Sequence, residues 1–149
     1  MLRTDSVTAH VAASPEAVFD LVTDLQRLPE WNRGITELVE APGRLEEGAV
    51  WKVRIHAMGQ SWVSKSTATA LDKGTLHFAY RSQSDDGNPS YADWAWRIES
   101  EDDGARATVT VNLVPITFWR RYLFVRIRRP GLRKEMSESL AALTAHVQP

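Results

Sequence analysis

The chain has 149 residues, of which 43% are hydrophobic and 25% charged, and its formal net charge is −1. A chain of this length fits one ordinary domain, expected over residues 1–149, and its near-neutral charge gives no overall field that would attract nucleic acid. Cysteine is absent, which excludes disulfides, thiolate nucleophiles and cysteine metal sites and is compatible with a reducing cytoplasm.

The N-terminal segment has the pattern of a strand, followed by the pattern of a helix. Apolar and polar side chains alternate over residues 7–11, the period of a half-buried strand. Ser14 can cap a helix over residues 15–24 that begins with proline, a residue suited to the first helical position. Residues 25–31 predict a second short helix, or a turn, broken by Pro29.

Six further segments have the composition of strands, and turn signals separate them. They cover residues 35–40, 50–56, 61–71, 75–82, 91–99 and 105–113. Nearly all the connections are short, which favours an antiparallel meander. The third and fourth of these strands flank Asp72-Lys73-Gly74, which predicts a tight hairpin.

From residue 116 to about residue 147 the apolar residues recur with the spacing of a helix. One face of this predicted helix carries Leu132, Met136, Leu140 and Leu143, whereas Glu135 and its charged neighbours fall mostly on other faces. Pro130-Gly131 should kink or split the helix near its middle. A sheet followed by a terminal amphipathic helix predicts an α+β fold in which the helix covers one face of the sheet.

No apolar run approaches the roughly 20 residues that a membrane-spanning helix needs. The nearest stretch, residues 116–127, is interrupted by Arg120, Arg121 and Arg126. We therefore expect a soluble, cytoplasmic protein without a transmembrane segment.

This order of elements, together with particular residues, resembles the START-like (SRPBCC) superfamily and most closely its polyketide cyclase/dehydrase branch. The resemblance is carried by residues 13–19 (ASPEAVF), by Thr23-Asp24 with residues 28–31 (LPEW), by Gly48, by residues 102–108 and by the leucines of the terminal helix. It implies a helix-grip fold, in which a seven-stranded curved antiparallel sheet wraps around a long C-terminal helix and two short helices follow the first strand. Members of the superfamily include lipid carriers, hormone receptors and cyclases, so the resemblance does not set a reaction.

Aromatic side chains are concentrated on one face of the predicted strands, and the chain has six tryptophans. On the long predicted strand, the row Trp62, Ser64, Ser66, Ala68 and Ala70 is mostly small, and small residues opposite the helix would leave volume unfilled. Ligand sites are typically apolar with a few polar groups, so we predict a cavity between sheet and helix. The alternative is that the aromatic side chains simply pack against the helix. The residues predicted to line the site are Trp51, Val53, Ile55, Trp62, Ser64, Ser66, Phe78, Tyr80, Trp94 and Trp96, with Phe118, Tyr122 and Met136 as the helix lid.

The sequence indicates neither a metal site nor a set of catalytic residues. His10, His56 and His77 fall on the polar phase of their strands, and no pair of histidines has the spacing of metal ligands. We therefore expect no metal and no cofactor, and whether the protein is an enzyme stays open.

The segment from Ile116 to Lys134 interleaves arginines with large apolar residues, which fall on two arcs of the predicted helix. One arc can close the cleft, whereas the second would need a subunit, a membrane surface or an anionic ligand. Three interpretations stay open for this segment: a solvated helix, a homodimer contact and a peripheral membrane contact. The basic stretch is too short to favour nucleic-acid binding.

Three functions follow from these observations. The first is binding of a small hydrophobic or aromatic molecule, lipid-like or polyketide-like. The second, implied by the resemblance, is a polyketide cyclase or dehydratase in which Tyr80 or a buried arginine would polarise a carbonyl. The third is a protein- or membrane-interaction module that uses residues 116–134. An enzyme needs at least one titratable group deep in the cavity, whereas a carrier needs none.

Overall fold

The computed structural model describes residues 4–57, 59–87, 89–114 and 125–147. The strands are β1 (Thr4–Val11), β2 (Ile35–Glu40), β3 (Val50–Ala57), β4 (Gln60–Asp72), β5 (His77–Ser84), β6 (Tyr91–Glu101) and β7 (Gly104–Val114). The helices are α1 (Pro15–Thr23), the 3₁₀ turn η1 (Leu25–Arg27), α2 (Leu28–Trp31) and α3 (Val125–Val147).

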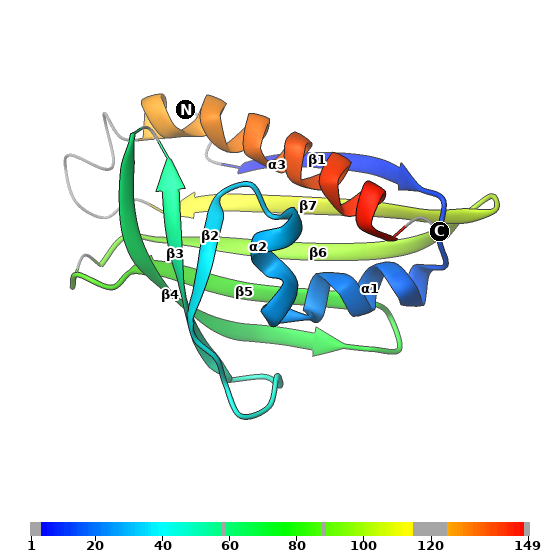
Figure 1. Ribbon diagram of the computed structural model, residues 1–149, viewed down its shortest axis with the longest axis horizontal. Coiled ribbons are helices and arrows are strands. Elements are labelled where there is room, and N and C mark those ends of the chain that lie inside the picture. Colours follow the sequence, from blue (N-terminus) through cyan, green and yellow to red (C-terminus); the bar gives the residue numbers. More distant parts are fainter. Residues whose placement is uncertain (1–3, 58, 88, 115–124, 148–149) are drawn as a thin grey trace.

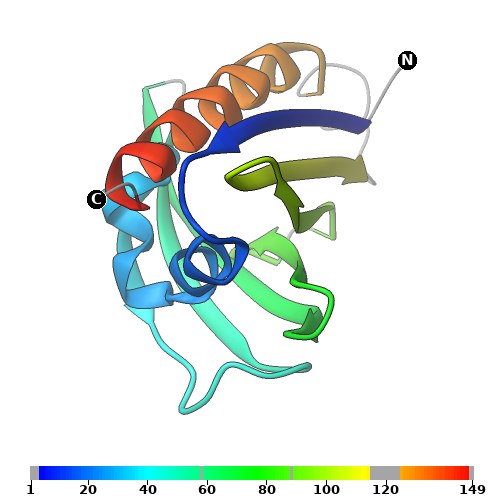
Figure 2. The ribbon, with the colours of Figure 1, turned by 90° about the vertical axis from the view of Figure 1, so that its right-hand side faces the viewer.

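The seven strands form one antiparallel sheet in the order β1-β7-β6-β5-β4-β3-β2. Successive strands from β2 to β7 are neighbours, and β1 closes the far edge by pairing with β7. Figures 1 and 2 show the sheet curling, with α3 lying along the β1 side and α1 and α2 in front of the middle strands. The predicted helix-grip architecture is therefore confirmed, with two short helices after the first strand.

In the segment between α1 and β2, the role of Pro29 differs from the predicted one. The Ser14 hydroxyl caps α1 by accepting from the Ala17 N–H at 3.1 Å. Pro29, however, lies in the first turn of α2, where its missing N–H costs no helical hydrogen bond. Pro29 thus belongs to the start of this short helix and does not break it.

A β-bulge in β4 corrects the predicted inward row of that strand. Ala68 pairs with Tyr80, but the next pair is Ala70 with Ala79, so Thr69 is the extra residue. Beyond the bulge the two faces exchange, and Leu71 joins the inward side opposite Phe78. Ala70 therefore lies on the outer face, contrary to the prediction.

The connection between β4 and β5 is longer than predicted. β4 continues to Asp72 and β5 begins only at His77, two residues later than expected. The Asp72 carboxylate accepts from the backbone N–H groups of Gly74 (2.8 Å) and Thr75 (3.2 Å), and these bonds lower the pKa of the carboxyl group. Leu76 completes the turn with a left-handed φ of 54°.

Helix α3 runs without a break from Val125 to Val147, so the predicted split at Pro130-Gly131 is wrong. Proline removes one backbone donor, but packing holds the helix in place, because Met136, Leu140 and Leu143 are buried in the common core. The part of the predicted helix from Ile116 to Phe124 lies outside the described residues.

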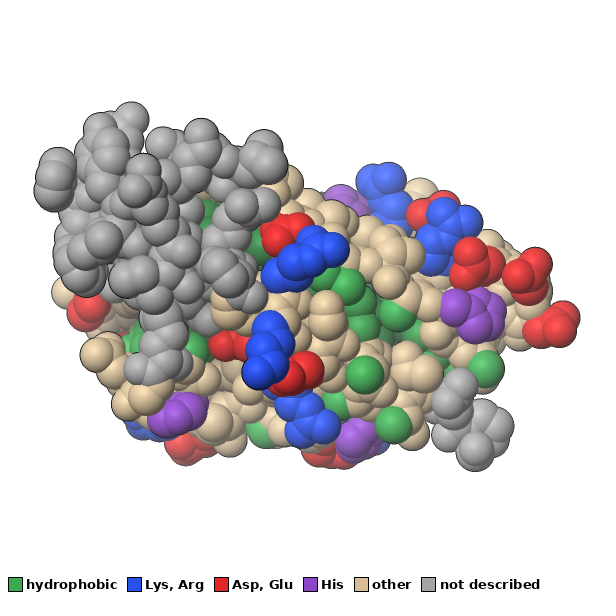
Figure 3. Space-filling view, turned by 90° about the horizontal axis from the view of Figure 1, so that it is seen from above, with side chains coloured by type: hydrophobic (Ala, Val, Ile, Leu, Met, Phe, Trp, Pro, Cys, Tyr) green, Lys and Arg blue, Asp and Glu red, His purple; other side chains and the backbone are tan. Residues whose placement is uncertain are grey.

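Two polar contacts fasten α3 to distant parts of the chain. Arg133 forms an ion pair with Asp5 of β1, and the Ser139 hydroxyl accepts from the Arg33 N–H at 2.9 Å. Figure 3 shows basic and acidic side chains side by side on the face that carries α3. No helix within the described ranges is long and apolar enough to span a membrane.

Candidate functional site

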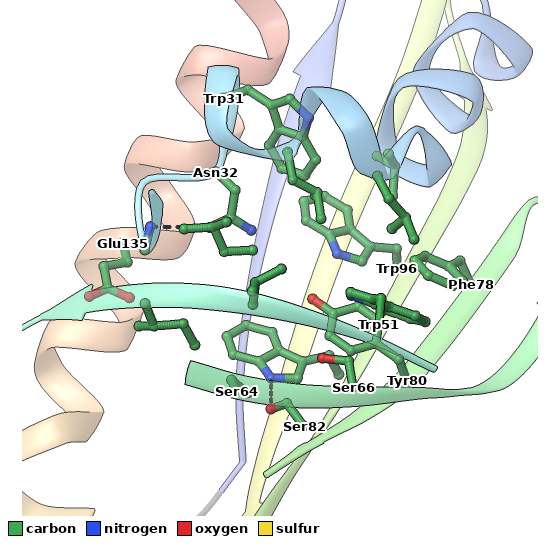
Figure 4. A pocket seen from close by; sticks show the side chains of 18 residues that line it. Trp31, Asn32, Trp51, Ser64, Ser66, Phe78, Tyr80, Ser82, Trp96 and Glu135 are labelled. Carbon is green, nitrogen blue, oxygen red and sulfur yellow. Dashed lines mark hydrogen bonds between the residues drawn. The ribbon is translucent and has the colours of Figure 1, made fainter. Parts of the chain in front are cut away.

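A cavity lies between the sheet and the helices. Its volume is about 70 Å³, and it opens to solvent at its mouth. All helical elements and strands β2 to β6 contribute side chains, which Figure 4 shows. The lining comprises Val22, Leu25, Leu28, Trp31, Asn32, Gly34, Ile35, Trp51, Val53, Ile55, Ser64, Ser66, Phe78, Tyr80, Ser82, Trp94, Trp96 and Glu135.

Four aromatic rings form a continuous wall on the sheet side. Tyr80 and Trp94 are cross-strand partners and stack at 6.2 Å with an interplanar angle of 15°. Tyr80 also lies 5.4 Å from Trp51 and 5.3 Å from Phe78, centroid to centroid. These separations are those of favourable aromatic pairs, so the wall is a fixed apolar surface.

A second aromatic pair connects the sheet to α2. The rings of Trp31 and Trp96 meet edge to face at 5.5 Å and 86°. The Trp31 indole N–H is buried and has no hydrogen-bond partner among the described residues. Such a group is rare in a folded protein, because a buried donor without a partner costs free energy.

Small side chains on β4, which lies between β3 and β5 in the same sheet, account for the open volume in front of this part of the sheet. Ser64 and Ser66 are 3% and 2% exposed and pair across the sheet with Val53 and Trp51. The Ser64 hydroxyl donates to the Gln83 carbonyl at 3.2 Å, so it is satisfied within the sheet. Large apolar residues at these two positions would fill the cavity.

The cavity holds a tyrosine that stays neutral over a wide pH range. Burial raises the pKa of the Tyr80 hydroxyl well above its ordinary value, and the indole N–H of Trp96 opposes this shift only in part. Figure 4 shows the hydroxyl directed toward Trp96 inside the cavity. Beside this tyrosine, the Trp94 indole N–H donates to the Ser82 hydroxyl at 3.1 Å.

One edge of the cavity is polar. The Asn32 side-chain oxygen accepts from the Gly34 N–H at 3.1 Å, which leaves its NH₂ group for other partners. Glu135 reaches the same edge from α3. A Cβ atom at Gly34 would lie 3.1 Å from the Glu135 Oε2 atom, so glycine gives the carboxylate its room.

A smaller hollow of about 20 Å³, roughly the space of one water molecule, adjoins the main cavity. It shares Asn32, Tyr80, Trp94, Trp96 and Glu135 with the main cavity. Its remaining lining is Val109, Met136 and Ser139, so the open space continues beneath α3.

The predicted site residues fall into four groups. Most of them line the cavity: Trp51, Val53, Ile55, Ser64, Ser66, Phe78, Tyr80, Trp94 and Trp96. Met136 lines the adjoining hollow, whereas Trp62 is half-buried beside Ile55 and lines neither space. Phe118 and Tyr122 lie outside the described residues.

Sequence reasoning missed the helical side of the cavity. Trp31, Asn32 and Ile35 come from a segment whose sequence signals concern caps and turns, and Glu135 was expected on another face of its helix. The nearest sequence signal was Gly34, a small residue next to the tryptophan and asparagine. Within the described ranges, no group of three or more His, Cys, Asp or Glu side chains could hold a metal ion.

Comparison with known proteins gives one match to a family and many to solved structures. A family model described as "Polyketide cyclase / dehydrase and lipid transport" matches residues 4–148. No curated protein matches the sequence.

The structural matches extend over nearly the whole chain. Protein CV1439 from Chromobacterium violaceum is 22% identical, with a TM-score of 0.72 and coverage of 99% of this chain and 98% of that one. The Zhui aromatase/cyclase from Streptomyces sp. R1128 is 16% identical, with a TM-score of 0.76 and coverage of 99% and 94%. A START superfamily protein from Mycobacterium smegmatis is 17% identical, with a TM-score of 0.73 and coverage of 97% and 99%. At such identities the likeness concerns the fold.

Proposed function

Because the chain belongs to the polyketide cyclase/dehydrase and lipid transport family, we propose that its cavity binds a small hydrophobic or aromatic molecule. The observation that carries this proposal is the aromatic wall of Trp51, Phe78, Tyr80 and Trp94 facing open volume. A protein core of that composition would ordinarily be filled, since interiors pack to crystal-like density.

The size of the cavity limits the ligand to a compact molecule. The cavity volume of about 70 Å³ is well below the roughly 300–1,000 Å³ of pockets that hold drug-sized ligands. Burying an apolar side chain or ring contributes about 2 kcal/mol, so contact with four or five rings supports micromolar affinity once association costs are subtracted.

The test is to fill the cavity by replacing a small residue of β4 with a larger one. In a tryptophan-fluorescence titration with fatty acids, sterols and polyaromatic compounds, we expect saturable binding by the wild-type protein. Ser66→Leu should weaken it by about tenfold or more, because the added methyl groups occupy the ligand's space. Lys65→Leu, an exposed change on the same strand, is the matched control and should bind as the wild type does.

Two results would contradict the proposal. One is a wild-type protein that responds to no compound of the panel. The other is a Ser66→Leu variant that keeps its circular dichroism spectrum and binds every compound as before, because the ligand would then lie elsewhere.

A second candidate function is catalysis of the cyclase or dehydratase type on a polyketide-like substrate. The observation that favours it is a neutral tyrosine hydroxyl inside the cavity, since Tyr80 can donate a hydrogen bond or a proton to a ligand carbonyl. No arginine is found among the described lining residues, so Tyr80 would act without the buried arginine that the sequence left open. Loss of turnover with retained binding in Tyr80→Phe would support catalysis, whereas a pure carrier would change only in affinity.

The homodimer and the membrane contact that residues 116–134 predict stay predictions. Most of this segment lies outside the described residues or is described by its backbone alone.

A further inference from the structure

The sheet side of the cavity carries two hydroxyl groups among its aromatic rings. Ser66 of β4 lies opposite Ser82 of β5, and Tyr80 comes two residues before Ser82 on the same strand. Residues two apart on a strand share a face, so Ser66 and Tyr80 are diagonal neighbours on the face that lines the cavity. Figure 4 shows both hydroxyl oxygens on the cavity side of the sheet.

The Ser66 hydroxyl borders the cavity without a hydrogen-bond partner. The residue is only 2% exposed, and no described residue bonds to its hydroxyl. Ser64, two residues earlier on the same face, differs because its hydroxyl donates to the Gln83 carbonyl. Polar groups inside folded proteins are normally paired, so an unpaired hydroxyl on a cavity wall indicates a partner that enters the cavity.

The Tyr80 hydroxyl has a proton to donate into the same space. Its oxygen is the hydrogen-bond partner of the Trp96 indole N–H, toward which Figure 4 shows it directed. An indole N–H can only donate, so the tyrosine oxygen is the acceptor in this contact. The hydroxyl proton of Tyr80 is therefore left for a group inside the cavity.

A carbonyl oxygen matches these two hydroxyls. It has two lone pairs and no proton, so it can accept from Tyr80 and from Ser66 together. A carboxylate fits less well, because the described residues that line the cavity include no lysine, arginine or histidine to pair with a buried negative charge. The cavity volume of about 70 Å³ favours a molecule with one ring, which can lie against Trp51, the cross-strand partner of Ser66.

We propose that the Ser66 and Tyr80 hydroxyls bind the carbonyl oxygen of a compact aromatic ketone. Each hydroxyl donates one hydrogen bond to that oxygen, and the ring of the ketone packs against the aromatic wall. This inference rests on the proposed function of the cavity and specifies the class of its ligand.

The test compares acetophenone with α-methylstyrene, in which a CH₂ group replaces the carbonyl oxygen and the shape is kept. Isothermal titration calorimetry should detect binding of both compounds to the wild-type protein. Tyr80→Phe should weaken acetophenone by about tenfold and α-methylstyrene by about twofold at most, because only the ketone loses a donor to a buried oxygen. Ser66→Ala should weaken acetophenone alone by about fivefold, the worth of one neutral hydrogen bond.

The carbonyl stretching band of bound acetophenone gives a second readout that a purely structural role would not move. A hydrogen bond to the oxygen weakens the C=O bond, so the infrared band should lie at lower frequency in the wild type than in Tyr80→Phe. Tyr91→Phe and Ser61→Ala are the matched controls, since Tyr91 lies over Arg81 away from the cavity lining and Ser61 is exposed. Both controls should keep the wild-type affinities and the wild-type band.

Equal weakening of the two compounds in Tyr80→Phe and in Ser66→Ala, with an unchanged carbonyl band, would overturn the inference and leave the cavity as a binding site. If neither compound binds to the wild type, the proposed function fails and this inference falls with it.

Discussion

Tyr80 illustrates how a single side chain acquires its properties from its surroundings. Its ring contacts Trp51, Phe78 and Trp94, and the burial that this implies keeps its hydroxyl protonated above the pH at which free tyrosine ionises. In the unfolded chain the pKa of this group returns to about 10. From about pH 10 upward the unfolded state therefore loses a proton that the folded state keeps, and stability falls as the pH rises.

We expect Tyr80→Phe to reduce this alkaline loss of stability. Urea denaturation of both proteins between pH 9 and about pH 11.5 measures it. The free energy of unfolding should fall more steeply in the wild type above about pH 10, whereas other titrating groups affect both proteins alike. Parallel curves would show that Tyr80 ionises in the folded protein as easily as in the unfolded chain.

At the scale of elements, the contact between α3 and the turn after α2 defines the polar edge of the cavity. The Ser139 hydroxyl, on a side chain that is 4% exposed, accepts the Arg33 N–H at 2.9 Å. This bond holds the turn that carries Asn32 and Gly34 against the helix that carries Glu135.

We expect Ser139→Ala to lower the free energy of unfolding by about 1–3 kcal/mol, because the Arg33 N–H loses its acceptor in a part-buried position. Ser137→Ala is the matched control: the same change at an exposed position of α3 gains only helix propensity, about half a kcal/mol. Urea denaturation measures both variants. Equal changes in the two would mean that the bond to Arg33 contributes nothing.

At the scale of the whole molecule, one core joins elements from both ends of the chain. Buried side chains from β1, α2, β3, β7 and α3 belong to the same cluster, among them Val11, Trp31, Trp51, Val109 and Leu140. Neither the sheet nor α3 can bury its apolar face without the other.

We therefore expect the chain to unfold in a single cooperative transition. Tryptophan fluorescence reports mainly on the cavity and far-ultraviolet circular dichroism reports on the whole backbone, so their midpoints in urea should coincide. Midpoints that differ beyond experimental error would show that part of the structure is stable alone, against the single domain expected from the sequence.

Local sequence patterns were sufficient for the order of the elements along the chain and for the sheet side of the cavity, whereas the helix-grip arrangement was implied by the family resemblance. Alternation in β3, β5 and β6 identified Trp51, Phe78, Tyr80, Trp94 and Trp96, because a strand turns successive side chains to opposite faces whatever its neighbours are. Helical spacing likewise identified the buried face of α3 that carries Leu140. Both signals depend on residues that are close in the chain.

Pairing and packing between distant segments decided the features that local patterns did not predict, namely the bulge in β4 and the polar edge of the cavity. The bulge at Thr69 depends on how β4 aligns with β5, so alternation along β4 alone placed Ala70 on the wrong face. The polar edge joins Asn32 to Glu135 across most of the chain, and neither residue carries a local sign of its neighbour. The sequence by itself thus determined which faces are apolar, because that follows from backbone periodicity. Only the tertiary structure decided where volume stays open and which polar groups border it, because both depend on contacts between residues far apart in sequence.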